Sequence, residues 1–589
     1  MKRITGSSSQ SCAGLWDFAF PGKVDIDALN PAAVCFAEKM PVPGAYDALP
    51  AHAGKLGVGA YRKSVRVPAG RHARLVFGAV SGQCRVWVDG VFLCEHACGY
   101  APFEVALPPA ASEEREVVVF ADNRFDFERA PLNLDYVDYY QYGGIIRDVA
   151  LEIFPPQGSW IDRVQVTPDA GNDPGGGVTL GVELGGVPGV IAQIRWRFEG
   201  EAASASRPAG SGTGTRYAAT VAKPRLWSPE TPNLHTVRVD ALDRGGCLVD
   251  SVEVRFGLRR IEARDGALLL NGEPVFLRGY NRHEWHPNFG PSTPVLQMAA
   301  DLQILKGMGC NFIRGAHYPQ DQTFLDLCDE LGILVWEEMN GGVPKPNYIT
   351  PKFLADHRRS LRAMVRASYN HPSVILWGFL NEAASDQAFT RPLYEEITGM
   401  LREMDPSRLI TYASNKAGKD LHLDLVDVIS LNLYPGWYHC DAIEEPLTTV
   451  SPVLRGHLDT YSTPEWRGKP LIISEVGAEA LYGWRDAHHD YFTEAYQAAL
   501  LERVCEELLS HPRCNGVCLW QFSDVRTWSG SRSLSRPRTF NNKGSFDEYR
   551  RPKAAVEIVG KLFRAAARER TPRDVAKGEV FPCDHPEGL

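Results

Sequence analysis

After about residue 261, short apolar runs alternate with segments of helical periodicity, which is the pattern of repeated strand–helix units. The predicted helices are 294–308, 322–331, 353–369 and 491–509. The eight predicted strands are 275–280, 311–314, 333–336, 374–380, 409–412, 428–431, 471–474 and 516–520. Eight parallel strands close into a (β/α)₈ barrel, for which roughly 250 residues are typical. We therefore predict a catalytic TIM barrel over residues 261–589, with room for insertions at its rim.

The part of the chain before this barrel contains only strand-like patterns. Residues 1–155 alternate apolar and polar positions between turn residues, and Asp89-Gly90 separates two such runs as a hairpin turn would. Residues 156–260 continue the pattern over roughly a hundred residues, the size of an immunoglobulin-like sandwich. We predict a jelly-roll-like sugar-binding β-sandwich at 1–155 and an immunoglobulin-like β-sandwich at 156–260.

Composition argues against several classes of function. The formal net charge of −9 and the pI near 6.0 provide no basic field for nucleic acid, and no apolar segment reaches the roughly 20 residues needed to cross a bilayer. Residues 1–7 lead into polar residues without the apolar core of a secretory signal. The 13 cysteines lack paired zinc-site spacing. We expect a cytoplasmic protein with free thiols, no metal site, and neither nucleic-acid nor membrane partners.

Two of the predicted barrel strands run directly into a glutamate. The run from Val374 to Leu380 ends in Asn381-Glu382, and the run from Leu471 to Ser474 ends in Glu475. Catalytic groups of (β/α)₈ barrels lie at the carboxyl ends of strands. Retaining glycosidases need two carboxyl groups there, one as acid and one as nucleophile. The pair Glu382 and Glu475 therefore predicts glycoside hydrolysis, with the Asn381 amide available to a sugar hydroxyl.

Five motifs occur in order along the chain: Tyr142 to Arg147 (YGGIIR), Leu277 to Glu284 (LRGYNRHE), Arg314 to Pro319 (RGAHYP), Trp377 to Glu382 (WGFLNE) and Ser474-Glu475. With them, and with the same domain order, the chain resembles glycoside hydrolase family 2 over nearly its whole length, and within that family the bacterial β-glucuronidases. The resemblance implies that Glu382 is the acid/base and Glu475 the nucleophile of a two-step displacement with retention. No metal or organic cofactor is required for it.

The sugar is predicted by a second motif, Asn541-Asn542-Lys543-Gly544. A glucuronide carries a carboxylate, which needs charge-assisted donors, and residues two apart in an extended loop point to the same side. Asn541 and Lys543 can thus converge on one carboxylate, as in the Asn-x-Lys motif of the family's glucuronidases. An arginine is expected just before this motif, and of Arg536 and Arg538 we favour Arg538.

Further substrate-binding residues follow from the resemblance. Asp138 from the first sandwich and His283 are expected to bind sugar hydroxyls. Tyr434 and Tyr438 are expected near the nucleophile and the ring, and Trp520 beneath the sugar, because aromatic faces suit apolar sugar surfaces. A loop Asp capping a turn, a structural His and packed aromatic residues are the alternatives.

We expect a retaining β-glucuronidase that acts on a small-molecule or oligosaccharide β-uronide and forms a homo-oligomer, dimer or tetramer. A β-galacturonidase is the nearest alternative, since the two sugars differ only at the C4 hydroxyl. A β-galactosidase is disfavoured because its neutral sugar would leave Lys543 unmatched. A catalytically silent sugar-binding protein is disfavoured by the intact pair of Glu382 and Glu475.

Overall fold

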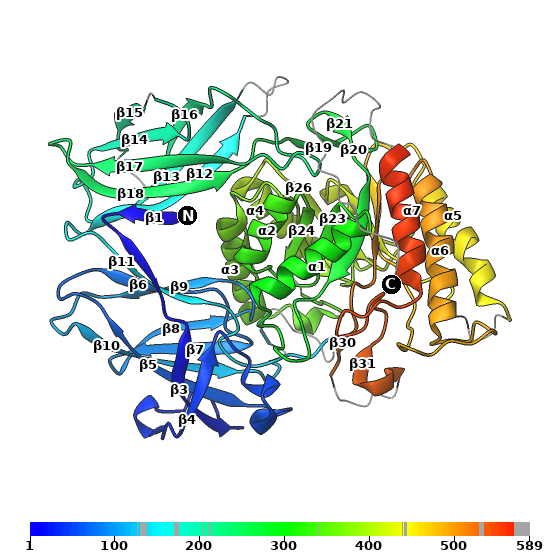
Figure 1. The fold of residues 1–589 in the computed structure, drawn as a ribbon, viewed down its shortest axis with the longest axis horizontal. Helices are drawn as coiled ribbons and strands as arrows, with labels where there is room; N and C mark the ends of the chain where they lie inside the picture. The colour runs from blue at the N-terminus through cyan, green and yellow to red at the C-terminus, as the bar shows by residue number, and fades with distance from the viewer. Residues whose placement is uncertain are drawn as a thin grey trace, which may run out of the picture.

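The computed structural model describes residues 1–126, 128–129, 138–169, 176–202, 204–210, 214–339, 341–438, 440, 444–528 and 535–569. Two groups of antiparallel sheets lie on one side of a strand–helix barrel, and the chain passes from the sheets into the barrel (Figure 1). Among the helices described, none has a stretch long and apolar enough to span a bilayer.

The first sandwich has a six-stranded and a four-stranded sheet. In order across the first sheet the strands are β4 (Glu38–Val42), β3 (Gly14–Gly22), β5 (Val58–Arg66), β10 (Glu114–Asp122), β7 (Gln83–Val88) and β8 (Val91–Ala97). Across the second they are β2 (Ser8–Ser11), β11 (Val149–Ile153), β6 (Ala73–Phe77) and β9 (Phe103–Leu107). The predicted hairpin joins β7 to β8. Asp89 and Gly90 both have positive φ, 52° and 77°, as a two-residue hairpin turn with right-handed strand twist requires.

The second sandwich has a five-stranded and a three-stranded sheet. The larger sheet orders β1 (Lys2–Thr5), β18 (Leu248–Phe256), β17 (His235–Leu242), β14 (Gln193–Phe198) and β15 (Ala205–Pro208); the smaller orders β12 (Ser159–Pro168), β13 (Gly177–Gly186) and β16 (Thr215–Thr220). β1 is an exception to the predicted division at residue 155. It pairs antiparallel with β18, with Arg3 opposite Val252, so the start of the chain completes the second sandwich.

The barrel is closed by eight parallel strands, as predicted. They are β22 (Leu277–Arg282), β23 (Phe312–Gly315), β24 (Leu334–Met339), β25 (Val374–Asn381), β26 (Leu409–Ser414), β27 (Ile429–Asn432), β28 (Leu471–Glu475) and β29 (Gly516–Leu519). β29 returns to β22, with Gly516 opposite Leu277. A small sheet of β19 (Ile261–Arg264), β20 (Ala267–Leu270) and β21 (Glu273–Pro274) leads into the barrel.

The helices of the barrel are α1 (Val295–Gly307), α2 (Gln322–Leu331), α3 (Pro351–Ser368), α4 (Arg391–Met404), α5 (Val450–Thr460), α6 (Glu494–Ser510) and α7 (Ala555–Glu569). Their ends follow ordinary capping chemistry. Thr350 accepts a hydrogen bond from the Phe353 N–H at 3.0 Å and Pro351 occupies the first position of α3. α2 ends at Gly332 with φ 69°, where a Cβ would lie 2.4 Å from a backbone oxygen.

The first sandwich is joined to the barrel by a buried arginine. Arg147 donates to Glu284 and, at 2.8 Å and 2.7 Å, to the carbonyls of Tyr100 and Pro319. The Tyr100 ring stacks on Tyr318 with centroids 3.6 Å apart. Because a buried charge is costly unless it is fully bonded, this contact fixes the sandwich against the ends of the barrel strands.

Candidate active site

Glu382 and Glu475 stand at the carboxyl ends of β25 and β28, separated by two barrel strands. Glu382 directly follows β25 and donates its backbone N–H to the Ala413 carbonyl at 2.9 Å, while Glu475 is the last residue of β28. Asn432 ends β27, the second of these two strands, and lies opposite Glu475 in the parallel register. The same Asn432 donates its side-chain amide to Glu382 Oε1 at 2.9 Å. Asn432 therefore bonds the carboxyl group of Glu382 through its side chain and lies beside Glu475 through its backbone.

Each carboxyl group has its own set of hydrogen-bond donors. Asn415 donates to Glu382 Oε2 at 3.1 Å, in addition to Asn432. Glu475 accepts from Arg314 at 2.7 Å and from the Tyr434 hydroxyl at 2.7 Å. Glu382 is bonded by neutral amides and Glu475 by a guanidinium and a phenol. Because charge-assisted bonds favour the ionised form of an acceptor, this asymmetry suits an anionic Glu475.

Arg314, at the end of β23, organises the floor of the site. It is completely buried and donates to Glu475, to Asn281 at 3.1 Å, to Asn381 Oδ1 at 2.9 Å and to both oxygens of Glu338. Although burial opposes its charge, Glu338 and Glu475 raise the pKa of Arg314 above its ordinary value. The bond from Arg314 fixes the Asn381 oxygen, which orients the Asn381 amide nitrogen as the remaining donor.

The pKa of Glu382 lies above its ordinary value. Loss of hydration within the surrounding protein is the main cause, and the negative charge of Glu475 is the second; the hydrogen bond from Asn432 acts in the opposite direction. The Glu382 side chain is nevertheless open to solvent at the strand ends, where substrate can reach it. A carboxyl group whose pKa is raised by burial and by a neighbouring carboxylate suits general acid catalysis.

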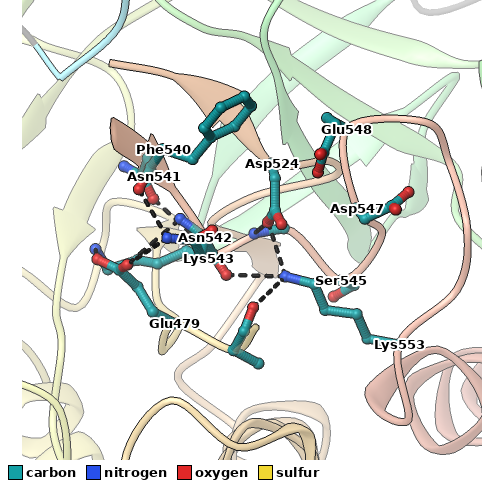
Figure 2. A network of polar contacts seen from close by, with 12 residues as sticks. Glu479, Asp524, Phe540, Asn541, Asn542, Lys543, Ser545, Asp547, Glu548 and Lys553 are labelled. Carbon is teal, nitrogen blue, oxygen red and sulfur yellow. Dashed lines mark hydrogen bonds and ion pairs between the residues drawn. The ribbon is translucent and has the colours of Figure 1, made fainter. Parts of the chain in front are cut away.

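A second polar group lies beside this pair and contains Lys543 and Asn541. Lys543 Nζ donates to the Tyr438 hydroxyl at 2.8 Å and bonds Glu479 at 3.3 Å. Asn541 Nδ2 donates to Asp138 Oδ2 at 2.8 Å, so the predicted residue from the first sandwich does reach the barrel. Figure 2 shows Asn541, Asn542 and Lys543 on one loop with Glu479 facing it.

The two groups are contiguous through a pair of tyrosines. The rings of Tyr434 and Tyr438 meet edge to face with centroids 5.2 Å apart. Tyr434 bonds Glu475, and Tyr438 bonds Lys543. The ammonium of Lys543 also lies 5.7 Å from the centre of the Tyr434 ring. The predicted nucleophile therefore shares one site with Asn541 and Lys543, the residues predicted to bind the sugar carboxylate. We call these two residues, together with the adjacent Arg536, the carboxylate reader.

Arg536, and not Arg538, is the arginine of this site, so the preference for Arg538 was wrong. Arg536 Nε donates to Asp138 at 3.1 Å, Nη2 donates to the Tyr438 hydroxyl at 3.2 Å, and Nη1 pairs with Glu479. Arg538 instead donates to Glu548 at 3.0 Å and to the Asn542 side chain at 3.0 Å. Its φ of 62° interrupts the extended backbone, so alternation along the chain does not carry its side chain to the side of Asn541 and Lys543.

The loop that carries Asn541 and Lys543 is supported from beneath by Lys553. Lys553 Nζ lies 2.8 Å from Asp524 and donates to the carbonyls of Ala480 at 2.6 Å and Asn542 at 3.0 Å (Figure 2). Asp524 in turn accepts from the Gly544 N–H at 3.0 Å. Burial raises the pKa of Asp524 to about 7, and Lys553 works against that shift. This network fixes the backbone on both sides of Lys543.

Trp520, the aromatic residue predicted to lie beneath the sugar, belongs to a packed group of rings. Trp520 is buried and stacks on His317 with centroids 5.0 Å apart, and His283 meets the Trp520 ring edge to face at 5.5 Å. His283 Nδ1 lies 3.3 Å from the Tyr318 hydroxyl, whereas its Nε2 is buried without a partner among the described residues. Burial lowers the pKa of His283 well below its ordinary value, which favours the neutral ring.

Several functional positions carried no assigned role in the sequence analysis. Arg314 lay within a quoted motif, and Asn432 and Glu338 lie at strand ends of the kind that supply catalytic groups. The position of these polar residues at strand ends is the feature of the sequence that could have indicated a role in the site. Glu479, however, lies beyond the strand end in a loop, and its partners Arg536 and Lys543 are 57 and 64 residues away. No local pattern indicates that contact.

One group of side chains in the described part of the chain has metal-ligand geometry: Asp326, Asp329 and His371. His371 Nδ1 is 2.6 Å from Asp329, and Arg255 pairs with Asp326. The group lies near the start of β25, at the end of the barrel opposite Glu382, and these contacts account for it as a structural ion-pair cluster.

Comparison with known proteins identifies the family of this chain. The model of glycosyl hydrolases family 2, TIM barrel domain, matches residues 261–567, and the model of glycosyl hydrolases family 2 matches residues 160–259. A β-glucuronidase from Paenibacillus borealis is 28% identical over 562 residues, which cover 88% of this chain and 90% of that relative.

Two solved structures are similar over nearly the whole chain. One is a β-galacturonidase from Eisenbergiella tayi bound to galacturonate, 33% identical, with a TM-score of 0.86 and coverage of 96% of this chain and 98% of that one. The other is a β-glucuronidase from Bifidobacterium dentium complexed with coumarin-3-O-glucuronide, 25% identical, with a TM-score of 0.85 and coverage of 95% and 97%.

Proposed function

Because the chain belongs to glycoside hydrolase family 2, we propose that this glycoside hydrolase is a retaining β-glucuronidase, which converts β-D-glucuronides to glucuronate and the free aglycone. One observation carries the proposal: the ammonium of Lys543 lies in the same site as Glu475, joined to it through Tyr438 and Tyr434. A cation at that place complements the carboxylate of a uronide, whereas a neutral sugar leaves it unmatched.

The chemistry follows from the two carboxyl groups. In the first step a Glu475 oxygen attacks the anomeric carbon, the bond from that carbon to the aglycone oxygen breaks, and the Glu382 proton passes to the leaving oxygen. In the second step Glu382 takes a proton from water, the water oxygen attacks the same carbon, and Glu475 leaves. Two inversions give retention. Neither step calls for a metal or an organic cofactor.

The assignment of roles rests on the surroundings of each carboxyl group. Arg314 and Tyr434 donate to Glu475 and favour its anion, which a nucleophile needs. The raised pKa of Glu382 favours the protonated form that an acid needs. The reverse assignment would require a protonated group against the Arg314 guanidinium, which electrostatics disfavours.

The sugar carboxylate is assigned to the group around Lys543. We place it against the Lys543 ammonium and the Asn541 amide, with Arg536 beside them and Tyr438 between the two cations. The hydroxyls of the sugar are assigned to Asp138, Asn381 and His283, and its apolar face to Trp520. Charge-assisted bonds in such a dehydrated site are stronger than neutral ones, each contributing about 1.5–3 kcal/mol.

β-Galacturonide hydrolysis is the second candidate, for a specific reason. The structural relative from Eisenbergiella tayi that is 33% identical is a β-galacturonidase, while the β-glucuronidase relatives named above are 25% and 28% identical. Both sugars present the same carboxylate to Lys543 and differ at the C4 hydroxyl. The cytoplasmic location and the homo-oligomer expected from the sequence are further proposals, which fractionation and light scattering test.

The test is a side-by-side measurement of kcat/KM for chromogenic β-glucuronide, β-galacturonide and β-galactoside with one aglycone. The proposal expects the glucuronide to be fastest and the galactoside slowest. Faster turnover of the galacturonide than of the glucuronide selects the second candidate. Faster turnover of the galactoside than of both uronides refutes the assignment of Lys543 to a substrate carboxylate.

A further inference from the structure

Glu479 faces the cations of the predicted carboxylate reader and has no role in the chemistry above. It lies four residues beyond Glu475, in the segment that follows β28, and its side chain is completely buried. One oxygen, Oε1, contacts Lys543 Nζ at 3.3 Å and Arg536 Nη1; the other, Oε2, accepts from Asn542 Nδ2 at 3.2 Å. Glu479 is thus bonded to the loop that is expected to bind the substrate carboxylate (Figure 2).

Among the described residues, the charges of this cluster balance in the absence of substrate. Lys543 and Arg536 supply two positive charges, and Asp138 and Glu479 supply two negative charges. Burying two cations without counter-ions would be strongly unfavourable, so the anions allow the folded protein to hold both cations in place. A uronate that enters this cluster adds a negative charge to a neutral group and is repelled by Glu479 while it is attracted by Lys543.

Lys543 keeps capacity for a further partner. An ammonium has three N–H donors, and among the described residues the side chain of Lys543 bonds two groups, the Tyr438 hydroxyl and Glu479. The third donor is available to a substrate oxygen. Glu479 therefore need not leave for the uronate to bind, but its charge remains close to that of the uronate.

We propose that Glu479 is the built-in counter-ion of the carboxylate reader, a positioning residue that maintains Lys543 and Arg536 in the free protein and lowers the affinity for uronates. This inference rests on the proposed function. It predicts an exchange of stability for affinity: removing the charge of Glu479 weakens the fold and strengthens the binding of anionic sugars, while neutral sugars are unaffected.

The experiment compares Glu479→Gln with the wild-type protein by inhibition. Free glucuronate, free galacturonate and the neutral sugars glucose and galactose are used as competitive inhibitors at neutral pH and fixed ionic strength. For Glu479→Gln we expect the Ki of the preferred uronate to fall about tenfold, which corresponds to about 1.4 kcal/mol, with a lowered melting temperature. The Ki values of the neutral sugars should not change.

Glu548→Gln is the matched control. Glu548 is also a largely buried glutamate paired with an arginine, Arg538, on the same loop, but it does not contact Lys543. Glu548→Gln should lower the melting temperature without changing the Ki of the uronate. An unchanged or raised uronate Ki in Glu479→Gln overturns the inference. If the wild-type protein itself binds neither uronate, both the proposed function and this inference fail.

A double-mutant cycle tests the counter-ion role even if Glu479→Gln folds poorly. In the wild-type background, Glu479→Gln leaves the buried Lys543 ammonium without its counter-ion and therefore lowers the stability of the fold. In a Lys543→Met background the ammonium is already absent, so the same substitution should lower the stability less. We expect the destabilisation by Glu479→Gln to be markedly smaller in the Lys543→Met background. Additive effects of the two substitutions would show no coupling and would overturn the inference.

Discussion

Asp138 and Arg536 lie 398 residues apart in the chain and form an ion pair at the rim of the barrel, with Arg536 Nε 3.1 Å from Asp138 Oδ1. Asp138 also accepts the Asn541 amide at 2.8 Å. A single carboxylate of the first sandwich therefore orients two residues of the proposed carboxylate reader. This contact explains how a domain without catalytic glutamates contributes to the site.

Replacing Asp138 by Asn should lower kcat/KM for β-uronides by about 100-fold, a loss of about 2.7 kcal/mol, because Asp138, unlike Glu479, is assigned to a sugar hydroxyl in addition to its contacts with Arg536 and Asn541. The melting temperature should change little, since Asp138 is only partly buried. Steady-state kinetics and thermal unfolding of the same preparation provide the measurement. Activity equal to wild type would remove Asp138 from the site.

Replacing Glu475 by Ala should abolish turnover, with a loss of at least ~10³-fold in kcat, because no carboxylate remains to attack the anomeric carbon. Added azide is small enough to take the place of the missing side chain. Product analysis by NMR should then give the α-configured glycosyl azide, since a single displacement inverts the β-substrate. A β-configured azide, or rescue of Glu382→Ala with the α-product instead, would exchange the two roles.

The raised pKa of Glu382 has a consequence for stability. Because the folded state binds this proton more strongly than the unfolded state does, the stabilisation is present below the ordinary glutamate pKa and is lost as the pH rises through the folded-state pKa. Glu382→Gln carries no such proton. The melting temperature of Glu382→Gln relative to wild type should therefore increase with pH across this window, and a difference independent of pH would contradict the shift.

Replacing Lys553 by Met should destabilise the protein by about 3–5 kcal/mol, because it leaves the buried Asp524 without its counter-ion and removes a donor from the carbonyls of Ala480 and Asn542. It should also raise the pKa of Asp524 above its present value of about 7. A raised folded-state pKa makes stability fall as the pH increases from about 4 towards and past 7. Lys553→Arg, which keeps the charge, is the control, and equal stability of both variants at pH 8 would contradict the argument.

The barrel and the catalytic pair were predictable because both depend on local sequence. Strand predictions such as 374–380 and 471–474 differ from β25 and β28 by one residue at their ends. The apolar runs are buried on both faces, so composition alone marks them. Glu382 and Glu475 follow those runs directly, and barrel topology brings the carboxyl ends of all eight strands to one rim.

Contacts between distant segments were not predictable in the same way. The alternation rule holds only in extended backbone, and the left-handed φ of 62° at Arg538 carries that side chain to Glu548 while Arg536 takes the place beside Asp138. The pairing of β1 with β18 joins segments some 250 residues apart, and a four-residue strand contains too little pattern to specify its partner. Long-range pairing of this kind is decided by the assembled fold.

The central claim is that Lys543 recognises the carboxylate of the sugar. Its most direct test is Lys543→Met, measured on a β-uronide and on the corresponding β-hexoside with the same aglycone. The account predicts that kcat/KM for the uronide falls by about 100-fold or more, while the slow rate on the hexoside is maintained or increased. Equal losses on both substrates, or an unchanged rate on the uronide, would contradict it.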